Sequence, residues 1–317
     1  MRLAIILNAG PEPIDETRCD GKVQQIKAAF APLGIEPEII LCPASKLTRT
    51  AQELSTEPYD MLVAGGGDGT VSSIATGLVD TQMPLAVLPL GTLNHFARDL
   101  KMPDDLAEAA KAIRDGVTQA IDVGEVNGRV FVNNSSIGLY PDAVMVRDDQ
   151  QRRHGLGKWT AMFLAACRVM WRFPLLAVHV AMQQRSIVTK TPFVFVGNNE
   201  YQTGIRSLGQ REHLDRGELA VYTVRCRGRA HMLWLILRGL FGSPEQVKDF
   251  EVERVSEAKV HLKRRALQVG MDGEVVRLAS PLVYRCRAGA LIVRRARTEA
   301  EKMVEQPPPL APEEQVA

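Results

Sequence analysis

The sequence predicts an α/β fold in two parts: an N-terminal domain built on a parallel sheet, then a mostly antiparallel β domain, either a sandwich or a barrel. Over residues 1–125, apolar runs alternate with helical patterns, as they do in βαβ units. Beyond about residue 117 the runs are short, rich in Val, Arg and Thr, and often alternate apolar with basic residues, as half-exposed antiparallel strands do. We therefore expect an α/β domain over 1–125, a β domain over 126–296 and a Pro- and Glu-rich, disordered tail over 297–317.

The first part consists of apolar runs, which we interpret as strands, and of segments with helical spacing between them. Strands joined by helices of this length form a parallel sheet with both faces covered. The expected strands are 2–8, 35–41, 59–64 and 84–90, and the expected helices are 22–33, about 46–54, one from 70, one near 94–100 and 104–115.

The second part opens with two β-rich runs around Asn127-Gly128, a dipeptide that strongly favours a two-residue hairpin turn. Helical stretches at about 156–172 and 230–241 interrupt the β pattern. Further strands are expected at 175–181, 186–197, 218–226, 257–263, 266–270, 274–278 and 291–295.

The composition, with 45% hydrophobic and 24% charged residues, is that of a soluble globular protein. The five cysteines are scattered without a C-x-x-C pair, which suits a reducing compartment and provides no zinc or disulfide framework. The N-terminal MRLAIILNAG reads as a first strand rather than a signal peptide, and no apolar stretch of about 20 residues is free of charge. We expect a cytoplasmic protein without a membrane-spanning helix.

The net charge of +2 hides an asymmetry along the chain. Residues 1–125 carry 10 Lys and Arg against 18 Asp and Glu, residues 126–297 carry 28 against 14, and residues 298–317 carry 1 against 5. A basic half joined to an acidic half predicts a face that meets an anionic partner, such as nucleic acid or a membrane surface. The alternative is that the Arg-rich strands simply have a solvated face.

The loop after the third expected strand reads GGGDGT (65–70), with Asp68 in its middle. Glycines let phosphate oxygens approach backbone N–H groups, and the start of the following helix adds positive potential. The loop is not a Walker A motif, because no Gly-Lys-Ser/Thr follows, and it is not a Rossmann G-x-G-x-x-G, because Thr70 stands at the third glycine. Alone, it predicts either a phosphate loop or a tight turn.

A second unit repeats the pattern of strand, Gly-Thr and helix in MPLAVLPLGTLNHFARDL (83–100), with Gly91-Thr92 in the turn. Both turns fall at the C-terminal ends of parallel strands, where ligands of open α/β sheets bind. Asn94 adds a side-chain donor and acceptor there. Two such loops beside each other suit a chain of phosphates.

A pair of carboxylates, Asp272 and Glu274, lies in LQVGMDGEVVRL (267–278). Asp272-Gly273 is typical of a hairpin turn. A carboxylate at a hairpin tip can also act as a general base, with a second carboxylate as its electrostatic partner. The six histidines show no metal-ligand spacing, and no G-x-S-x-G occurs, which argues against an α/β-hydrolase.

Two strongly apolar stretches, 155–176 and 230–242, contain all three tryptophans. They are either core helices or helices that lie in a membrane interface, where the side chains of Trp159, Trp171 and Trp234 would be well placed.

Six segments, in order along residues 1–296, resemble the diacylglycerol kinase catalytic family, and more closely its soluble bacterial lipid kinase branch, which is related to sphingosine kinases and distantly to NAD kinases. They are GGGDGT (65–70), PLGTLNHFARDL (89–100), NNSSIGL (133–139), FVFVGNN (193–199), LDRGEL (214–219) and MDGE (271–274). The resemblance implies an NAD kinase-like α/β nucleotide domain and a β-sandwich that carries much of the lipid pocket, with ATP in the cleft between them.

The resemblance also implies roles for single residues. Asp272 would be the general base that takes the proton of the lipid hydroxyl, with Glu274 supporting it, and Asp215 is the candidate ligand of a structural Mg²⁺. A further Mg²⁺ would accompany ATP and neutralise charge on the transferred phosphoryl group. The expected ATP-binding residues are Asn8 in the first strand-end loop, Gly66, Gly67, Asp68, Gly69 and Thr70 in the first glycine loop, and Gly91, Thr92 and Asn94 in the second.

The chain departs from the family pattern at three places. His95 stands where the family has the aspartate of Asn-Asp-Phe-Ala, so a carboxylate near the nucleotide is missing. Arg216 replaces the second aspartate of Asp-Asp-Gly, which helps to hold the structural Mg²⁺ in some members, and its charge is hypothesised to substitute for the ion. The segment QTGIRSLGQREHL (202–214) replaces a glycine-rich stretch.

The resemblance therefore implies an ATP- and Mg²⁺-dependent kinase acting on a hydroxyl of a diacylglycerol-like membrane lipid, with no nucleic acid partner. The basic second domain predicts peripheral contact with an anionic membrane, at its inner face. Two alternatives stay open: an NAD kinase-like phosphotransferase, since that family shares GGDGT, and a non-catalytic nucleotide- or lipid-binding protein, which His95 and Arg216 allow.

Overall fold

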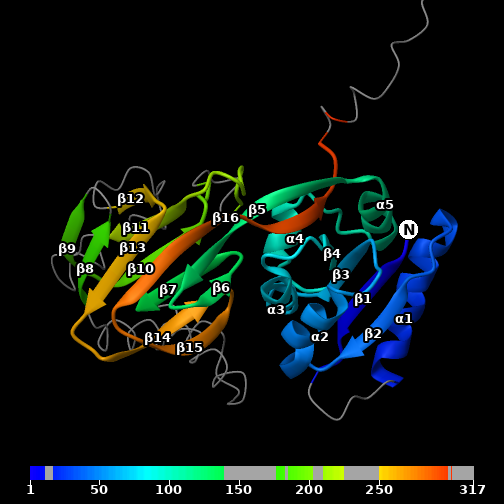
Figure 1. Ribbon diagram of the computed structural model, residues 1–317, viewed down its shortest axis with the longest axis horizontal. Helices are drawn as coiled ribbons and strands as arrows, with labels where there is room; N and C mark the ends of the chain where they lie inside the picture. The colour runs from blue at the N-terminus through cyan, green and yellow to red at the C-terminus, as the bar shows by residue number, and fades with distance from the viewer. Residues whose placement is uncertain are drawn as a thin grey trace, which may run out of the picture.

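The computed structural model describes residues 1–10, 17–138, 176–182, 185–202, 210–224, 250–298 and 301. An α/β part and a β-rich part lie side by side, and two long strands, β5 (Val117–Val126) and β16 (Leu282–Arg295), run from one to the other (Figure 1). The expected fold class is confirmed: a parallel sheet comes first in the chain, and antiparallel strands follow it.

The α/β part is built on four parallel strands with helices between them. These elements are β1 (Leu3–Asn8), α1 (Thr17–Phe30), the 3₁₀ helix η1 (Ala31–Leu33), β2 (Glu38–Cys42), η2 (Ala44–Lys46), α2 (Leu47–Leu54), β3 (Met61–Gly66), α3 (Asp68–Leu78), β4 (Leu85–Pro89), α4 (His95–Asp99) and α5 (Leu106–Asp115). The strand order is β2-β1-β3-β4. α2 packs against α3 on one side of this sheet, and α1 packs against α5 on the other (Figure 1). Because both faces are covered, β1 is an almost unbroken apolar run.

Every strand and helix expected in this part is present, with shifted ends. The α-helix expected at 22–33 begins at Thr17 and ends at Phe30, after which η1 contains Pro32. Proline has no N–H to donate and its ring clashes with the preceding turn, so the α-helix cannot continue through it. Gly34 then closes the turn with φ of 67°. The strand expected at 35–41 begins only at Glu38, after Pro37.

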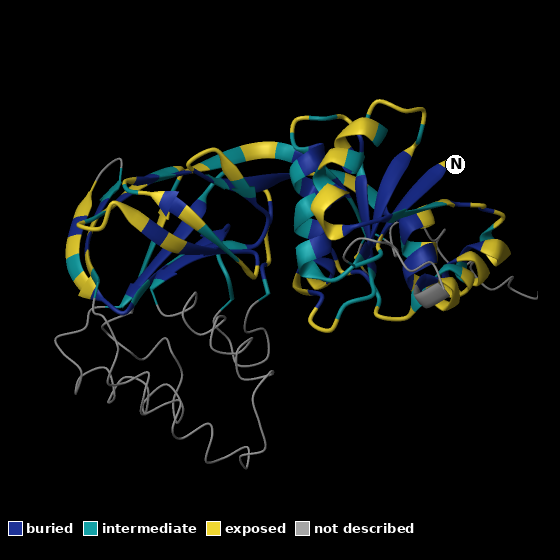
Figure 2. Ribbon diagram, turned by 90° about the horizontal axis from the view of Figure 1, so that it is seen from below, coloured by how far each residue is buried: buried dark blue, intermediate teal, exposed yellow. Residues whose placement is uncertain are grey.

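The β-rich part consists of short antiparallel strands in two sheets. They are β6 (Arg129–Phe131), β7 (Asn134–Gly138), β8 (Leu176–Met182), β9 (Ser186–Thr191), β10 (Phe193–Asn198), β11 (Leu219–Val224), β12 (Phe250–Val255), β13 (Glu257–Leu262), β14 (Ala266–Met271) and β15 (Glu274–Ala279). One sheet has the order β12-β11-β10-β7-β14-β15, and the other continues the parallel sheet through β4-β16-β13-β8-β9. Side chains of both sheets, among them Val260, Tyr284, Val196 and Val269, share one core. Buried positions alternate with exposed ones along several of these strands (Figure 2).

Two expectations for the β strands were wrong in detail. The run 186–197 is two strands, because Pro192 interrupts it and the chain turns back from β9 into β10. The strand expected at 291–295 is only the end of β16, whose pairing with β5 is interrupted between Arg287 and Leu291. β12 was not predicted.

The hairpin expected at Asn127-Gly128 is confirmed between β5 and β6, with φ of 47° and 81° at its two turn residues. The helical stretches expected at 156–172 and 230–241, and nearly all of the tail, lie outside the described residues. In the part of the chain that the structure does describe, no helix is long and apolar enough to cross a membrane.

Candidate active site

The first glycine loop joins β3 to α3 and is compact. A Cβ atom at Gly66 would lie 2.6 Å from Oγ1 of Thr70, so no side chain fits there. Thr70 is itself buried, and its Oγ1 accepts a hydrogen bond of 3.1 Å from Nδ2 of Asn8 at the end of β1. Three of the predicted ATP-binding residues, Asn8, Gly66 and Thr70, are therefore in one place.

The second glycine loop lies directly against the first. A Cβ atom at Gly91 would be 2.4 Å from Cα of Gly67, so the two backbones touch and Gly91 has no room for a side chain, whereas a Cβ at Gly67 would lie 3.4 Å from Cα of Gly91. Asn94, with φ of 50°, uses its side chain inside the loop: Oδ1 accepts from N of Gly91 at 3.0 Å, and Nδ2 donates to O of Gly91 at 2.9 Å and to O of Pro89 at 3.2 Å. Thr92 is exposed at the loop surface.

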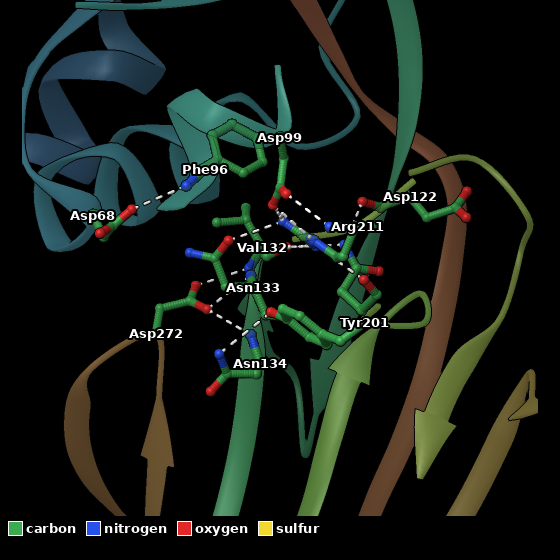
Figure 3. A network of polar contacts seen from close by, with 11 residues as sticks. Asp68, Phe96, Asp99, Asp122, Val132, Asn133, Asn134, Tyr201, Arg211 and Asp272 are labelled. Atoms are coloured by element: carbon green, nitrogen blue, oxygen red, sulfur yellow. Dashed lines mark hydrogen bonds and ion pairs between the residues drawn. The ribbon is translucent and has the colours of Figure 1, made fainter. Parts of the chain in front are cut away.

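Asp68, at the start of α3, links the two loops. Its Oδ1 accepts a hydrogen bond of 3.1 Å from N of Phe96 in the first turn of α4 (Figure 3). The carboxylate of Asp68 is therefore bonded to the segment that follows the second loop, while glycines occupy the positions where the two loops touch.

Asp272 lies in the turn between β14 and β15, against α3, the helix that follows the first glycine loop. Asp272 and Gly273 have φ of 47° and 93°, so the expected hairpin is confirmed. The carboxylate is buried and reaches α3, where Oγ of Ser72 donates to it at 2.5 Å. Three backbone amides also donate to it, those of Val132 at 2.8 Å, Asn133 at 2.8 Å and Asn134 at 3.0 Å.

Burial raises the pKa of the Asp272 carboxyl above its ordinary value, and the four donors act against that shift by stabilising the charged form. Glu274 differs, because it is exposed, and its Oε1 lies 3.8 Å from where a Cβ of Gly69 would be. The structure therefore brings both predicted catalytic carboxylates to the first turns of α3, one buried and one open to solvent.

A buried arginine, absent from the sequence prediction, ties these pieces together. Arg211 is 1% exposed. It donates from Nε and Nη2 to Oδ2 of Asp99 in α4 at 2.9 and 2.7 Å, and from its backbone N to Oδ1 at 3.0 Å. It also donates from Nη1 to O of Val132 and O of Asn198, and from Nη2 to Oδ1 of Asn133 (Figure 3). Arg211 thus connects the second glycine loop's helix to the segment that holds Asp272.

Comparison with known proteins identifies the family. A family model described as the diacylglycerol kinase catalytic domain matches residues 3–126. A diacylglycerol kinase of Staphylococcus epidermidis is 33% identical over 281 residues, which cover 86% of this chain and 85% of that protein. The chain belongs to the diacylglycerol kinase family.

Other members of this family show the same likeness. A diacylglycerol kinase of Bacillus subtilis is 41% identical over 93 residues, or 28% of this chain and 31% of that protein. The crystal structure of a diacylglycerol kinase from Bacillus anthracis covers 95% of this chain and 98% of its own, with a TM-score of 0.65 and 21% identity, and so shares the fold. The suspected family is confirmed, and the chain is a kinase of it.

Asp215, predicted as a ligand of a structural metal, is exposed, and its Oδ2 accepts from Nε2 of Gln119 at 2.9 Å. The neighbouring Gly217 donates its amide to buried Asp122 at 2.6 Å, so a second carboxylate, which the sequence did not single out, lies by this turn. Across the described residues, no group of three His, Cys, Asp or Glu side chains is placed to hold a metal ion. The metal role of Asp215 stays a prediction.

Sequence reasoning missed Ser72, Asp99 and Arg211. Ser72 and Asp99 lie within the helices that follow the two glycine loops. Their position close to these motifs is the one feature of the sequence that could have pointed to a role in the site. Arg211 lies in 202–214, which was marked only as a departure from the family pattern.

Proposed function

We propose that this kinase transfers the γ-phosphoryl group of ATP to a hydroxyl of a diacylglycerol-like lipid, with Asp272 as general base. The observation that carries the proposal is the 2.5 Å hydrogen bond between Ser72 and Asp272, because it joins the helix of the first glycine loop to a carboxylate of the β-rich part. In this proposal residues 1–125 bind ATP and residues 126–296 bind the lipid. The name of the relatives, diacylglycerol kinase, favours a lipid alcohol over NAD as acceptor.

The phosphates would be bound by backbone amides. The first amides of an α-helix have no acceptor within it, and the helix dipole adds positive potential, so the start of α3 suits an anion. The contact between Gly67 and Gly91 puts the second glycine loop directly beside the first, so both loops would border the phosphates. Asn8 and Thr70 would lie at the edge of the nucleotide, and Asn94 would shape the second loop rather than contact the ligand.

The residues present fit Mg²⁺ bound together with ATP. Mg²⁺ in kinases takes one or two carboxylates together with substrate phosphates. Asp68 and Glu274 offer carboxylate oxygens at the first glycine loop. When bound, the ion would neutralise charge on the transferred phosphoryl group.

Asp272 suits the role of general base. A carboxyl whose pKa is raised toward the working pH transfers protons more effectively than an ordinary one. Burial supplies that increase in pKa, and the hydrogen bonds of residues 132–134 fix the carboxylate in one orientation.

The test is transfer of radiolabelled phosphate from ATP onto a total lipid extract and onto vesicles that contain diacylglycerol. We expect label on a lipid that had a free hydroxyl. Asp272→Asn should keep ATP binding but lose about 10²–10⁴-fold in turnover, the usual contribution of a general base. Near-normal turnover of this variant would exclude Asp272 as the base. Label on NAD in a parallel reaction that contains NAD in place of lipid, or nucleotide binding without any transfer, would favour the alternative functions.

The kinase is further proposed to dock on the anionic cytoplasmic face of a membrane. Lys263, Arg264 and Arg265 are all exposed in the turn between β13 and β14, at the end of β14 opposite Asp272. Arg264 and Arg277 border a pocket of about 410 Å³ whose lining includes aliphatic side chains of both sheets. Basic side chains around an apolar pocket match a lipid surface that is anionic outside and apolar within.

The docking proposal predicts binding to vesicles that contain phosphatidylglycerol, and weaker binding as salt rises, because salt screens exposed charges. The double variant Arg264→Gln, Arg265→Gln should weaken binding by about 2 kcal/mol, near 1 kcal/mol for each basic residue at the surface. Lys22→Gln with Lys27→Gln removes two exposed charges from α1 and should leave binding unchanged. If the arginine variant and the lysine variant weaken binding equally, or if binding does not change with salt concentration, this docking surface is contradicted.

A further inference from the structure

The acceptor positions of the Asp272 carboxylate are all occupied. Oδ1 accepts from N of Asn133 at 2.8 Å and N of Asn134 at 3.0 Å. Oδ2 accepts from N of Val132 at 2.8 Å and Oγ of Ser72 at 2.5 Å. A carboxylate has about four lone-pair sites. A lipid hydroxyl therefore cannot donate directly to Asp272 unless one of these four donors leaves.

Three of the donors are held firmly in place. They are backbone amides of consecutive residues, and the amide of Asp272 itself donates to O of Asn134 at 3.0 Å, which closes the turn against this segment. Arg211 holds the same segment from the other side, through O of Val132 and Oδ1 of Asn133. Displacing an amide would leave a buried N–H without an acceptor, which is unfavourable.

Ser72 is different in kind. Among the four donors it is the one side-chain hydroxyl, with two lone pairs besides its proton. It is half-buried, and it lies one helical turn after Gly69, the residue that Glu274 approaches. A lipid hydroxyl at this surface can donate to Oγ of Ser72 while Ser72 keeps its own hydrogen bond to Asp272.

We propose that Ser72 relays the proton of the lipid hydroxyl to Asp272. The inference rests on the proposed function. In the step, a bond forms between the lipid oxygen and the γ-phosphorus, and the bond from that phosphorus to the bridging oxygen of ADP breaks. The lipid proton moves to Oγ of Ser72 while the Ser72 proton moves to Oδ2 of Asp272. Asp272, now neutral, returns the proton to solvent through Ser72 after the products leave.

The relay is tested with Ser72→Ala, Ser72→Thr and the control Ser73→Ala, in single-turnover transfer from ATP to diacylglycerol vesicles. Ser73 is the next residue of α3 and equally half-buried, so its alanine variant removes the same atom one position away. We expect Ser72→Ala to slow transfer about 100-fold, with ATP affinity and melting temperature close to wild type, and Ser72→Thr and Ser73→Ala to stay within about tenfold. Turnover of Ser72→Ala equal to or above wild type would mean that the lipid donates to Asp272 directly, and would overturn the relay.

A double-variant cycle tests whether Ser72 acts through Asp272, and the solvent isotope dependence then separates a proton relay from simple support of that carboxylate. If the proton passes through Ser72 to Asp272, Ser72→Ala should cause no further loss in an Asp272→Asn background, since residues that act as a unit are not additive. Additive losses would overturn the relay. Full turnover of Asp272→Asn alone would instead remove the proposed base, and so the two failures can be told apart. If two protons move in the step, the wild-type transfer rate should depend on the D₂O fraction along a curve. In Ser72→Ala one proton moves, and the same plot should be linear.

Discussion

At the scale of single residues, the two aspartates of the site show how position decides function. Asp68 bonds to one amide and joins the two glycine loops. Asp272 is enclosed by four donors, and burial raises its pKa. Both follow or precede glycines in similar sequence contexts, GGGDGT and MDGE, and only the tertiary surroundings distinguish them.

The contact between Gly67 and Gly91 gives a prediction for ATP binding. In Gly91→Ala the new Cβ would meet Cα of Gly67 at 2.4 Å and Oδ1 of Asn94 at 2.8 Å, so the two loops must separate. We expect a loss of about 1–3 kcal/mol in stability and about tenfold or more in affinity for a non-hydrolysable ATP analogue, measured by calorimetry. Gly21→Ala is the control, because its Cβ meets no atom within 4 Å and Gly21 belongs to α1, outside both loops. Wild-type affinity in Gly91→Ala would contradict the requirement for close loops.

The residues of the site were predictable where local chemistry marks them. Glycine loops at strand ends and a carboxylate at a hairpin tip can be recognised from sequence, because the backbone itself requires those residue types. Ser72 and Arg211 could not be recognised, because their partners lie 200 and 112 residues away in the chain. Nothing local in the sequence shows that an arginine will be fully buried.

At the scale of elements, two hairpins in the β-rich part have the same turn. Asn127-Gly128 and Asp272-Gly273 both place two residues at positive φ, as the two-residue turn between antiparallel strands requires. Such turns were predictable from dipeptides, whereas the break at Pro192 was missed because the apolar pattern continues across it.

This pair of turns permits a matched experiment. Gly128→Ala and Gly273→Ala introduce the same strain, at φ of 81° and 93°, and neither new Cβ meets an atom within 4 Å. Each should lower the free energy of unfolding by about 1–2 kcal/mol, measured by denaturant titration. Only Gly273→Ala should also lower kcat, because only that turn carries Asp272. Equal kcat in both variants would show that the orientation of Asp272 does not depend on its turn.

At the scale of the whole molecule, the two parts are joined by the strands β5 and β16 and by buried polar contacts. β16 pairs in parallel with β4 only at Val293 and Leu85 and otherwise belongs to the antiparallel strands. Arg211 adds a further connection, since Asp99 belongs to α4 while Val132 and Asn198 belong to the β-rich part. The order of the motifs predicted two parts, but it did not show which side chains join them.

Breaking the buried ion pair between Arg211 and Asp99 should lower the free energy of unfolding more than any other substitution proposed for this protein. Arg211→Met leaves the carboxylate of Asp99, 1% exposed, without its counter-ion, and should cost about 3–5 kcal/mol in denaturant unfolding. Adding Asp99→Asn removes that charge and should recover part of the loss. The recovery should be incomplete, because Met cannot donate hydrogen bonds to the carbonyl groups of Val132 and Asn198, as Arg211 does. Arg254→Met breaks an exposed pair with Glu200 at 2.7 Å and should cost less than about 1 kcal/mol. If Arg211→Met is no more costly than Arg254→Met, or if Asp99→Asn worsens it, the network does not hold the two parts together.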